Sequence, residues 1–137
     1  MVRKRSSDAK EKLLTEVELE VMQAVWGLCA QLGGECTVKD VQTALPKERD
    51  LAYTSVATML KILEQKGFLV SHKLERTLGY STEISREEYE GASLRHMAEN
   101  VFQGNPGSMV MKLLNEAELT KDELQNIRTL LNERLKS

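Results

Sequence analysis

One short stretch of the chain, residues 51–70 (LAYTSVATMLKILEQKGFLV), combines side chains that could recognise a nucleic acid. Its spacing predicts an amphipathic helix over 52–66, with Val56, Met59, Leu60 and Leu63 on one apolar face. The opposite face is small, polar and nearly free of acid. Its residues are Tyr53, Thr54, Ser55, Ala57, Thr58 and Lys61. Hydroxyls reach base edges or phosphates, and an alanine methyl can meet a thymine methyl, so this face suits a DNA major groove.

Two readings of this helix remain open from its own residues. An ordinary surface helix can carry the same polar face, and Ser55 can instead bond locally near the helix start. The flanking segments decide between the readings, because a groove-reading helix needs a scaffold that presents it.

The segments before this helix predict the first part of a helix-turn-helix. Thr15 and Glu18 have the spacing of a capping box, and the helix that follows runs to the Gly33-Gly34 pair. Thr37 and Asp40 form a weaker capping box, and a short helix then ends at Pro46. The order of long helix, short helix, turn and longer helix is that of a helix-turn-helix core.

The segments after Gly67 change from helical to alternating spacing. Residues 69–73 and 78–82 predict two strands joined by a short polar turn, which together make a β-hairpin wing. Lys73 and Arg76 lie at its tip and could contact a phosphate backbone. The alternative is a plain surface hairpin with solvated charges.

The last third of the chain predicts three helices. Ser85 with Glu88 begins one that runs to about Gln103, a short apolar segment follows the break at 104–107, and Thr120 begins the last helix. So few helices bury an apolar stripe poorly alone, which favours dimerisation through a second copy, with packing onto the N-terminal part as the alternative. The residues predicted for this dimer contact are Met109, Met111, Leu124, Ile127, Leu130 and Leu131.

The predicted fold is therefore mostly α with a small β-hairpin wing. We expect a flexible basic tail over 1–12, a winged helix-turn-helix DNA-binding domain over 13–83, and a three-helix dimerisation domain over 84–137. The chain has 137 residues and a net charge of −2, so it lacks the strongly basic balance of many nucleic-acid binders. Residues 37–82 carry a small excess of positive charge, which favours nucleic-acid binding only weakly.

Composition also limits location and cofactors. No apolar run approaches the roughly 20 residues needed to cross a membrane, and the basic N-terminus lacks the apolar stretch of a secretory signal. Cys29 and Cys36 are too few and too poorly spaced for a zinc site, and such sparse cysteines fit a reducing cytoplasm. Cys29 lies on an apolar helix face, where we expect it to be a buried small hydrophobe, and a disulfide with Cys36 is the alternative. We expect a cytoplasmic protein with no cofactor and no metal.

No spacing supports a catalytic arrangement around His72 or His96, and the Gly33-Gly34 pair is not part of a phosphate-binding loop. We therefore do not expect an enzyme. Two classes of function remain: a DNA-binding regulator, and a winged-helix protein-interaction module that binds no DNA.

The order and the amino-acid sequences of these segments resemble the penicillinase-repressor (BlaI/MecI/CopY) family of bacterial transcription regulators. The matching segments are LTEVELEVMQAVW (14–26), TVKDVQTAL (37–45), AYTSVATMLKILEQKGFL (52–69), the wing that ends in Tyr80, and the tail pattern around GNPGSMVMKLL and ELTKDELQNIRTLL. The resemblance covers residues 13–135. It implies a winged-helix domain, a helical dimerisation domain, and repression by a dimer on a palindromic operator.

The same resemblance implies that a sensor protease or another signal protein could relieve repression. In the antibiotic-resistance branch a sensor protease triggers cleavage at an Asn-Phe bond, which aligns with Lys112-Leu113 here, where neither residue matches. In the copper branch a C-terminal pair of Cys-x-Cys motifs binds metal, and the sequence has no cysteine after position 36. The resemblance therefore leaves the operator, the regulated genes and the inducing signal open.

Overall fold

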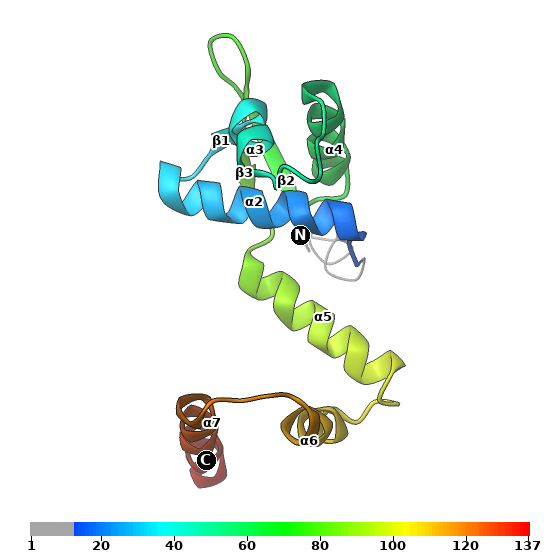
Figure 1. Cartoon of the computed structure of the whole chain (residues 1–137), viewed down its shortest axis with the longest axis vertical. Coiled ribbons are helices and arrows are strands. Elements are labelled where there is room, and N and C mark those ends of the chain that lie inside the picture. Colours follow the sequence, from blue (N-terminus) through cyan, green and yellow to red (C-terminus); the bar gives the residue numbers. More distant parts are fainter. Residues whose placement is uncertain (1–12) are drawn as a thin grey trace, which may run out of the picture. The chain divides into compact units, whose positions relative to one another are not determined.

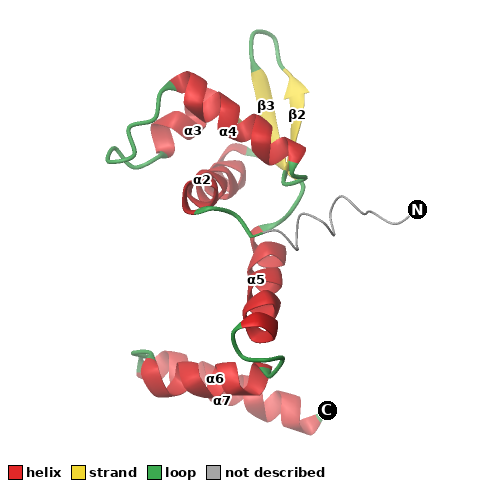
Figure 2. Cartoon of the chain, turned by 90° about the vertical axis from the view of Figure 1, so that its right-hand side faces the viewer, coloured by secondary structure: helices red, strands yellow, loops and turns green. Residues whose placement is uncertain are grey.

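Residues 13–137 are described by the computed structural model, so the basic tail predicted over 1–12 lies outside the described residues. The chain divides into two units: one ends at His96 and the other spans Met97–Ser137. The described residues form six helices and one small antiparallel sheet (Figures 1 and 2). The fold class is therefore the winged helix-turn-helix that the sequence predicts, followed by further helices.

The first helix of the described residues, α2 (Glu16–Leu32), begins and ends where its local sequence signals predict. Thr15 Oγ1 accepts a hydrogen bond from the backbone N–H of Glu18 at 3.2 Å, and Glu18 Oε1 accepts one from the N–H of Thr15 at 3.0 Å. This reciprocal capping box satisfies two donors of the first turn. Gly33 ends the helix with φ at +89°, a left-handed conformation that glycine adopts without a steric penalty.

The helix-turn-helix consists of α3 (Val38–Ala44) and α4 (Tyr53–Gln65). Thr37 caps α3 through the predicted box with Asp40. Helix α4 lies within the predicted range 52–66, with Ala52 and Lys66 as its two cap residues. Gly67 follows with φ at +92°, as expected of a glycine that terminates a helix.

The wing consists of β2 (Leu69–Lys73) and β3 (Leu78–Thr82), which pair antiparallel with Leu69 opposite Thr82. Its turn is closed by a 2.9 Å hydrogen bond from the N–H of Leu74 to the carbonyl of Thr77. Both strands have the predicted bounds. In both views the loop of this hairpin extends beyond α3 and α4 (Figures 1 and 2).

A third strand was not predicted. β1 (Cys36–Thr37) pairs with β3, so the strand order is β1-β3-β2. Cys36 lies opposite Tyr80, and Thr37 lies opposite Gly79. A two-residue strand is too short to show alternation in the sequence, and its pairing depends on residues far along the chain.

The core of the first unit joins every element from α2 to the start of α5 (Arg86–Asn100). Val56, Leu60 and Leu63 are fully buried, and Met59 is half-buried and packs against the core, which confirms the apolar face predicted for α4. Burying a side chain of this size contributes about 1.5–3 kcal/mol. The fully buried residues with the largest side chains in this unit are Phe68, Met22, Leu60, Leu63 and Ile84.

An aromatic cluster attaches the beginning of α5 to α2. Trp26 Nε1 donates a hydrogen bond to the carbonyl of Ile84 at 2.9 Å. The ring of Tyr89 lies 6.0 Å from that of Trp26 and 5.8 Å from that of Phe68, both within the range of favourable aromatic pairs. The Tyr89 hydroxyl accepts a hydrogen bond from the N–H of Leu14 at 2.9 Å. The first turns of α5 thus belong to the core of the first unit.

The second unit holds the end of α5, then α6 (Pro106–Glu116) and α7 (Lys121–Lys136). Helix α5 ends at Asn100, short of the predicted Gln103, because residues 101–104 turn and both Gln103 and Gly104 have positive φ. Asn105 and Thr120 cap α6 and α7. No residue of α6 or α7 is buried.

Candidate nucleic-acid interface

Helix α4 turns one face into the core and leaves the other exposed. On the outer face Tyr53, Thr54, Ser55, Thr58 and Lys61 are exposed, with 45% of Tyr53 accessible. Ala57 differs from the rest, because it is half-buried and packs against the core. The structure therefore brings the predicted groove-facing residues together on one surface, with Ala57 at its edge.

One hydroxyl of this face has a hydrogen-bond partner within the helix itself. Thr58 Oγ1 donates to the carbonyl of Thr54, one turn earlier, at 2.9 Å. Its oxygen still has lone pairs that can accept a hydrogen bond from a ligand. Ile62, 37% exposed, is an apolar side chain on α4 that was not among the predicted site residues.

The one acidic residue of α4 is turned away from this face toward the wing. Ser71 Oγ on β2 donates a 2.8 Å hydrogen bond to Glu64 Oε2. Burial raises the pKa of the nearby Tyr80, and the charge of Glu64 and the proximity of Tyr53 add to the rise. The exposed face of α4 thus carries hydroxyls and one ammonium group. The only carboxylate of the helix, that of Glu64, forms a hydrogen bond with Ser71 of the wing.

The wing adds two further cations. Lys73 ends β2 and Arg76 lies in the hairpin loop, and both are exposed. Neither they nor Lys61 form an ion pair with any residue of 13–137. Their positive charges are therefore available to an anionic partner.

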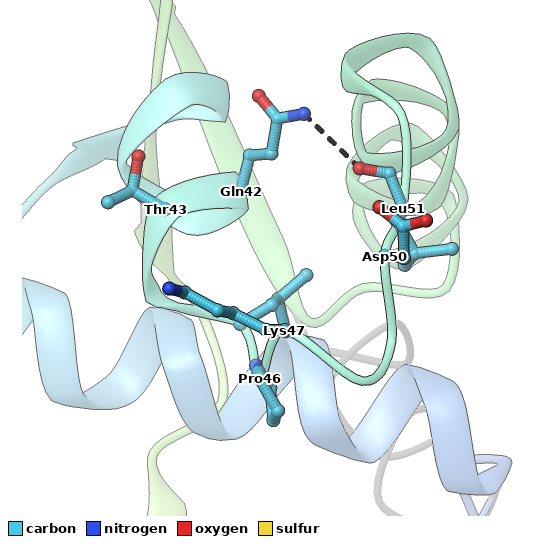
Figure 3. Close-up of a pocket in the computed structure, with 7 residues that line it drawn as sticks. Gln42, Thr43, Pro46, Lys47, Asp50 and Leu51 are labelled. Atoms are coloured by element: carbon cyan, nitrogen blue, oxygen red, sulfur yellow. Dashed lines mark hydrogen bonds between the residues drawn. The ribbon is translucent and has the colours of Figure 1, made fainter.

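The turn between α3 and α4 holds an open pocket of about 400 Å³ (Figure 3). Gln42 Nε2 crosses it to donate a 3.2 Å hydrogen bond to the carbonyl of Leu51, just before α4. The residues that line it are Gln42, Thr43, Leu45, Pro46, Lys47, Asp50 and Leu51. Gln42 was not predicted, because nothing in the local sequence indicates that its amide meets a backbone carbonyl nine residues later.

Two ion pairs connect α2 to the segments at either end of α4. Lys66 Nζ lies 2.7 Å from Glu18 Oε2, and Arg49 contacts both carboxylate oxygens of Glu20 at 2.8 and 2.7 Å. Burial alone would raise the pKa of Glu18, but hydrogen bonds from Lys66 and Thr15 leave that pKa lowered. The hydrogen bonds from Arg49 lower the pKa of Glu20 and raise the pKa of Arg49. Neither pair was predicted.

His72 has neighbours that sequence spacing did not reveal. Its Nε2 lies 3.1 Å from Ser81 Oγ and 3.7 Å from Glu35 Oε2. A Cβ atom at Gly79 would lie only 2.8 Å from Glu35 Oε1. The absence of a side chain at Gly79 therefore leaves room for the Glu35 carboxylate beside β3. Because both partners face the same ring nitrogen, His72 cannot take a proton from Ser81 while Glu35 orients the other nitrogen, as a nucleophilic triad requires.

The two cysteines are unpaired and approach each other near β1. Burial raises the pKa of the Cys36 thiol to about 12 and also raises that of Cys29. Cys29, which the sequence predicted to be buried, is half-buried, and its Sγ lies 3.7 Å from the carbonyl oxygen of Tyr80. Within residues 13–137 no three His, Cys, Asp or Glu side chains gather as a metal site, and no helix there has the length and apolarity to cross a membrane.

Comparison with known proteins extends over nearly the whole chain. A family model described as "Penicillinase repressor" matches residues 14–133. The methicillin resistance regulatory protein MecI of Staphylococcus aureus (strain N315) is 20% identical over 127 residues, covering 93% of this chain and 99% of MecI. The penicillinase repressor of Bacillus licheniformis is 26% identical over 120 residues, covering 88% of this chain and 90% of that protein.

Among solved structures, the DNA-binding domain of the repressor BlaI is similar, with 28% identity, a TM-score of 0.47, and coverage of 58% of this chain and 90% of that domain. The family assignment rests on the family model, which covers far more than half of the chain. The chain belongs to the penicillinase repressor family.

Proposed function

We propose that the protein is a dimeric transcriptional repressor that binds a palindromic DNA operator, with α4 in the major groove and the wing on phosphates. The observation that carries the proposal is the exposed face of α4, which offers hydroxyl groups and Lys61 while Glu64 is bound by Ser71. Hydroxyls and an ammonium group can pair with base edges and phosphates, whereas a free carboxylate would be repelled by the phosphates.

Family membership supports repression as the outcome of DNA binding. Relatives are named as a penicillinase repressor and as a methicillin resistance regulatory protein. The family consists of DNA-binding repressors and not of enzymes. The contacts of His72, whose Nε2 faces both Ser81 and Glu35, do not form a nucleophilic triad either. The target gene of this chain does not follow from the names of its relatives.

The wing provides the sequence-independent part of the proposed contact. Lys73 and Arg76 are exposed near the hairpin turn, on the segment that directly follows α4 and Gly67. Phosphate contacts of this kind fix the register of a protein on the duplex and carry no sequence information themselves. With a net charge of −2 on the whole chain, binding must depend on this local arrangement and on two copies acting together.

The second copy is proposed from the exposed apolar surface of α6 and α7. Met111, Leu124, Leu130 and Leu131 are between 46% and 65% exposed, while Met109 and Ile127 are half-buried. Burying this surface against an identical one would produce a two-fold dimer, whose symmetry matches a palindromic operator. A sedimentation measurement that showed only monomer at micromolar concentration would contradict this part of the proposal.

A sensor protease is the signalling partner that the family suggests. Lys112 and Leu113 lie within α6, and Lys112 Nζ is 2.9 Å from Glu116 Oε2 one turn later. Proteases cut exposed, extended segments most readily, so cleavage of this bond would require α6 to open first. Mass spectrometry of the protein recovered from induced cells tests this: fragments that end at Lys112 support cleavage there, and intact protein during induction contradicts it.

The proposed function is tested by fluorescence anisotropy with a duplex from the upstream region of the protein's own gene, at two salt concentrations and with a scrambled duplex as competitor. We expect tight, salt-sensitive binding that survives the competitor. Equal weak binding to all duplexes from the surrounding locus would contradict the proposal and favour the alternative, a winged-helix module that binds a protein partner.

A further inference from the structure

Helix α4 begins differently from the other helices of residues 13–137. Ala52 occupies its N-cap position and provides no side-chain hydrogen bond. Each of the other helices has a side-chain oxygen that accepts from its first turn: Thr15, Thr37, Ser85, Asn105 and Thr120. A cap of this kind fixes where a helix starts. The start of α4 must therefore be fixed by contacts from elsewhere in the fold.

The turn of residues 46–52 provides part of that fixation. The N–H of Arg49 donates to the carbonyl of Pro46 at 3.0 Å, and Gln42 Nε2 holds the carbonyl of Leu51 from α3 (Figure 3). Asp50 has φ at +46°, a left-handed conformation that costs energy for a residue other than glycine. Such a conformation persists only where the surrounding contacts hold the chain in place.

The strongest side-chain contact of this turn is with α2. Arg49 Nε and one of its terminal nitrogens reach the two oxygens of Glu20 at 2.8 and 2.7 Å, and both side chains are about one-third exposed. Exposed ion pairs add little to the free energy of unfolding. A two-point contact between a planar guanidinium and a carboxylate does, however, fix direction as well as distance. The pair thus ties the turn before α4 to a helix whose other side lies in the core.

We infer that Glu20 and Arg49 are positioning residues for sequence reading: their bidentate pair sets the place of the first turn of α4 relative to the rest of the winged helix. The inference rests on the proposed function, because it concerns the same DNA-reading surface. Tyr53 and Thr54 lie only a few residues after Arg49. Hydrogen bonds to bases tolerate only a few tenths of an ångström, so a shift of this turn would cost specific contacts first.

The first test asks whether removing the Glu20 carboxylate raises or lowers the affinity for DNA. Removing a carboxylate from a DNA-binding protein should strengthen binding if only charge matters. We expect the opposite for Glu20→Gln: affinity for the specific duplex falls about tenfold, as when one base contact is displaced, while affinity for the scrambled duplex does not fall. The matched control is Glu48→Gln, which removes an exposed carboxylate of the same turn that has no ion pair within residues 13–137. An unchanged or increased specific affinity for Glu20→Gln would overturn the inference.

The second test separates positioning from direct contact of Arg49 with a phosphate. Arg49→Glu alone should weaken specific binding, and adding Glu20→Arg should recover most of the loss, because the reversed pair restores the contact. A phosphate contact would not be recovered by the exchange, since the positive charge would then be on α2. Failure of the double variant to recover, with an unchanged thermal midpoint, would overturn the inference.

The third test asks where the effect acts. In a Thr54→Ala background, which removes a proposed DNA contact at the start of α4, Glu20→Gln should cost much less specific affinity than in the natural chain, because the two changes share that contact. In a Lys73→Ala background, which alters the wing, its cost should be unchanged. Equal costs in both backgrounds would overturn the inference. Loss of specific binding by the natural chain itself would instead contradict the proposed function, so the two failures are distinguishable.

Discussion

The hydroxyl of Ser71 donates a hydrogen bond to the carboxylate of Glu64 at 2.8 Å and so joins the wing to the last turn of α4. This hydrogen bond has two effects. Ser71 holds the negative charge of Glu64 away from the proposed DNA surface, and Glu64 fixes strand β2 beside α4. This relationship makes the acid of α4 compatible with a polyanionic ligand.

Removing the hydroxyl should therefore weaken DNA binding. We expect Ser71→Ala to lower operator affinity about threefold, because the released carboxylate of Glu64 can turn toward phosphates. Adding Glu64→Gln should restore the affinity by removing the charge. Anisotropy titrations of the two variants measure this, and an unchanged affinity for Ser71→Ala would show that the carboxylate stays away from DNA without its partner.

Placing a charge in the centre of the α4 face should abolish specific binding. Thr58→Asp adds an anion against a polyanion, while the position is exposed and its loss leaves no cavity. The matched control is Thr129→Asp on α7, where the hydroxyl likewise donates to the carbonyl one turn earlier and is exposed. Circular dichroism should be unchanged for both variants, and only Thr58→Asp should lose the operator. Operator binding by folded Thr58→Asp would remove this face from the interface.

The wing cation Lys73 should act without regard to sequence. Lys73→Ala should weaken specific and scrambled duplexes alike and reduce the slope of log K against log salt by about 1.8, the value for two phosphate contacts, one from each copy of the proposed dimer. Lys112→Ala, which removes a cation that pairs with Glu116 in the second unit, should leave the slope unchanged. A loss confined to the specific duplex would contradict the phosphate role of Lys73.

An acidic side chain in the apolar surface of α7 should separate the proposed dimer. Leu131 is half exposed, and Leu131→Asp should shift sedimentation toward monomer and reduce operator affinity at least tenfold. Leu32→Asp is a suitable control, since Leu32 is 52% exposed at the end of α2 and lies in the other unit. If Leu131→Asp sediments like the natural protein, α7 does not form the dimer contact.

The pKa of Glu18 predicts a pH-dependent contribution to stability. Because the pKa of this carboxyl is lowered on folding, its contribution is present above the unfolded value of about 4.5 and is lost as the pH falls through the folded value. Glu18→Gln should therefore lower the thermal midpoint at pH 7 and have little effect near pH 3. Lys66→Gln should reduce the same pH dependence, since Lys66 provides the ion pair. A midpoint difference independent of pH would assign the effect of Glu18 to helix capping alone.

The sequence predicts those features of the fold that depend on neighbouring residues. The capping boxes at Thr15, Thr37 and Thr120 are confirmed, as are the strand bounds of the wing, because each depends on signals within a few positions. The apolar side of α4 is confirmed for the same reason, since helical spacing alone determines it.

Features that depend on distant residues were not predicted. β1 exists because Cys36 meets Tyr80 across the sheet, and the ion pair of Glu20 with Arg49 joins positions 29 residues apart. The end of α5 was placed too late, since nothing in the local spacing marks the turn that begins after Asn100. The roles of the groove-facing, wing and dimer residues stay predictions, as do the domain bounds at 83 and 84.

The hydrogen bond from Trp26 to the carbonyl of Ile84, with Tyr89 packed between two rings, limits how the chain can be divided for experiments. A fragment that stops at position 83 would lose Ile84 and Tyr89 and expose the rings of Trp26 and Phe68 to water. Such a fragment should aggregate or melt early, whereas one that continues to His96 keeps the whole aromatic cluster. Isolation of a stable DNA-binding fragment thus depends on retaining a piece of the helix that the sequence assigns to the other domain.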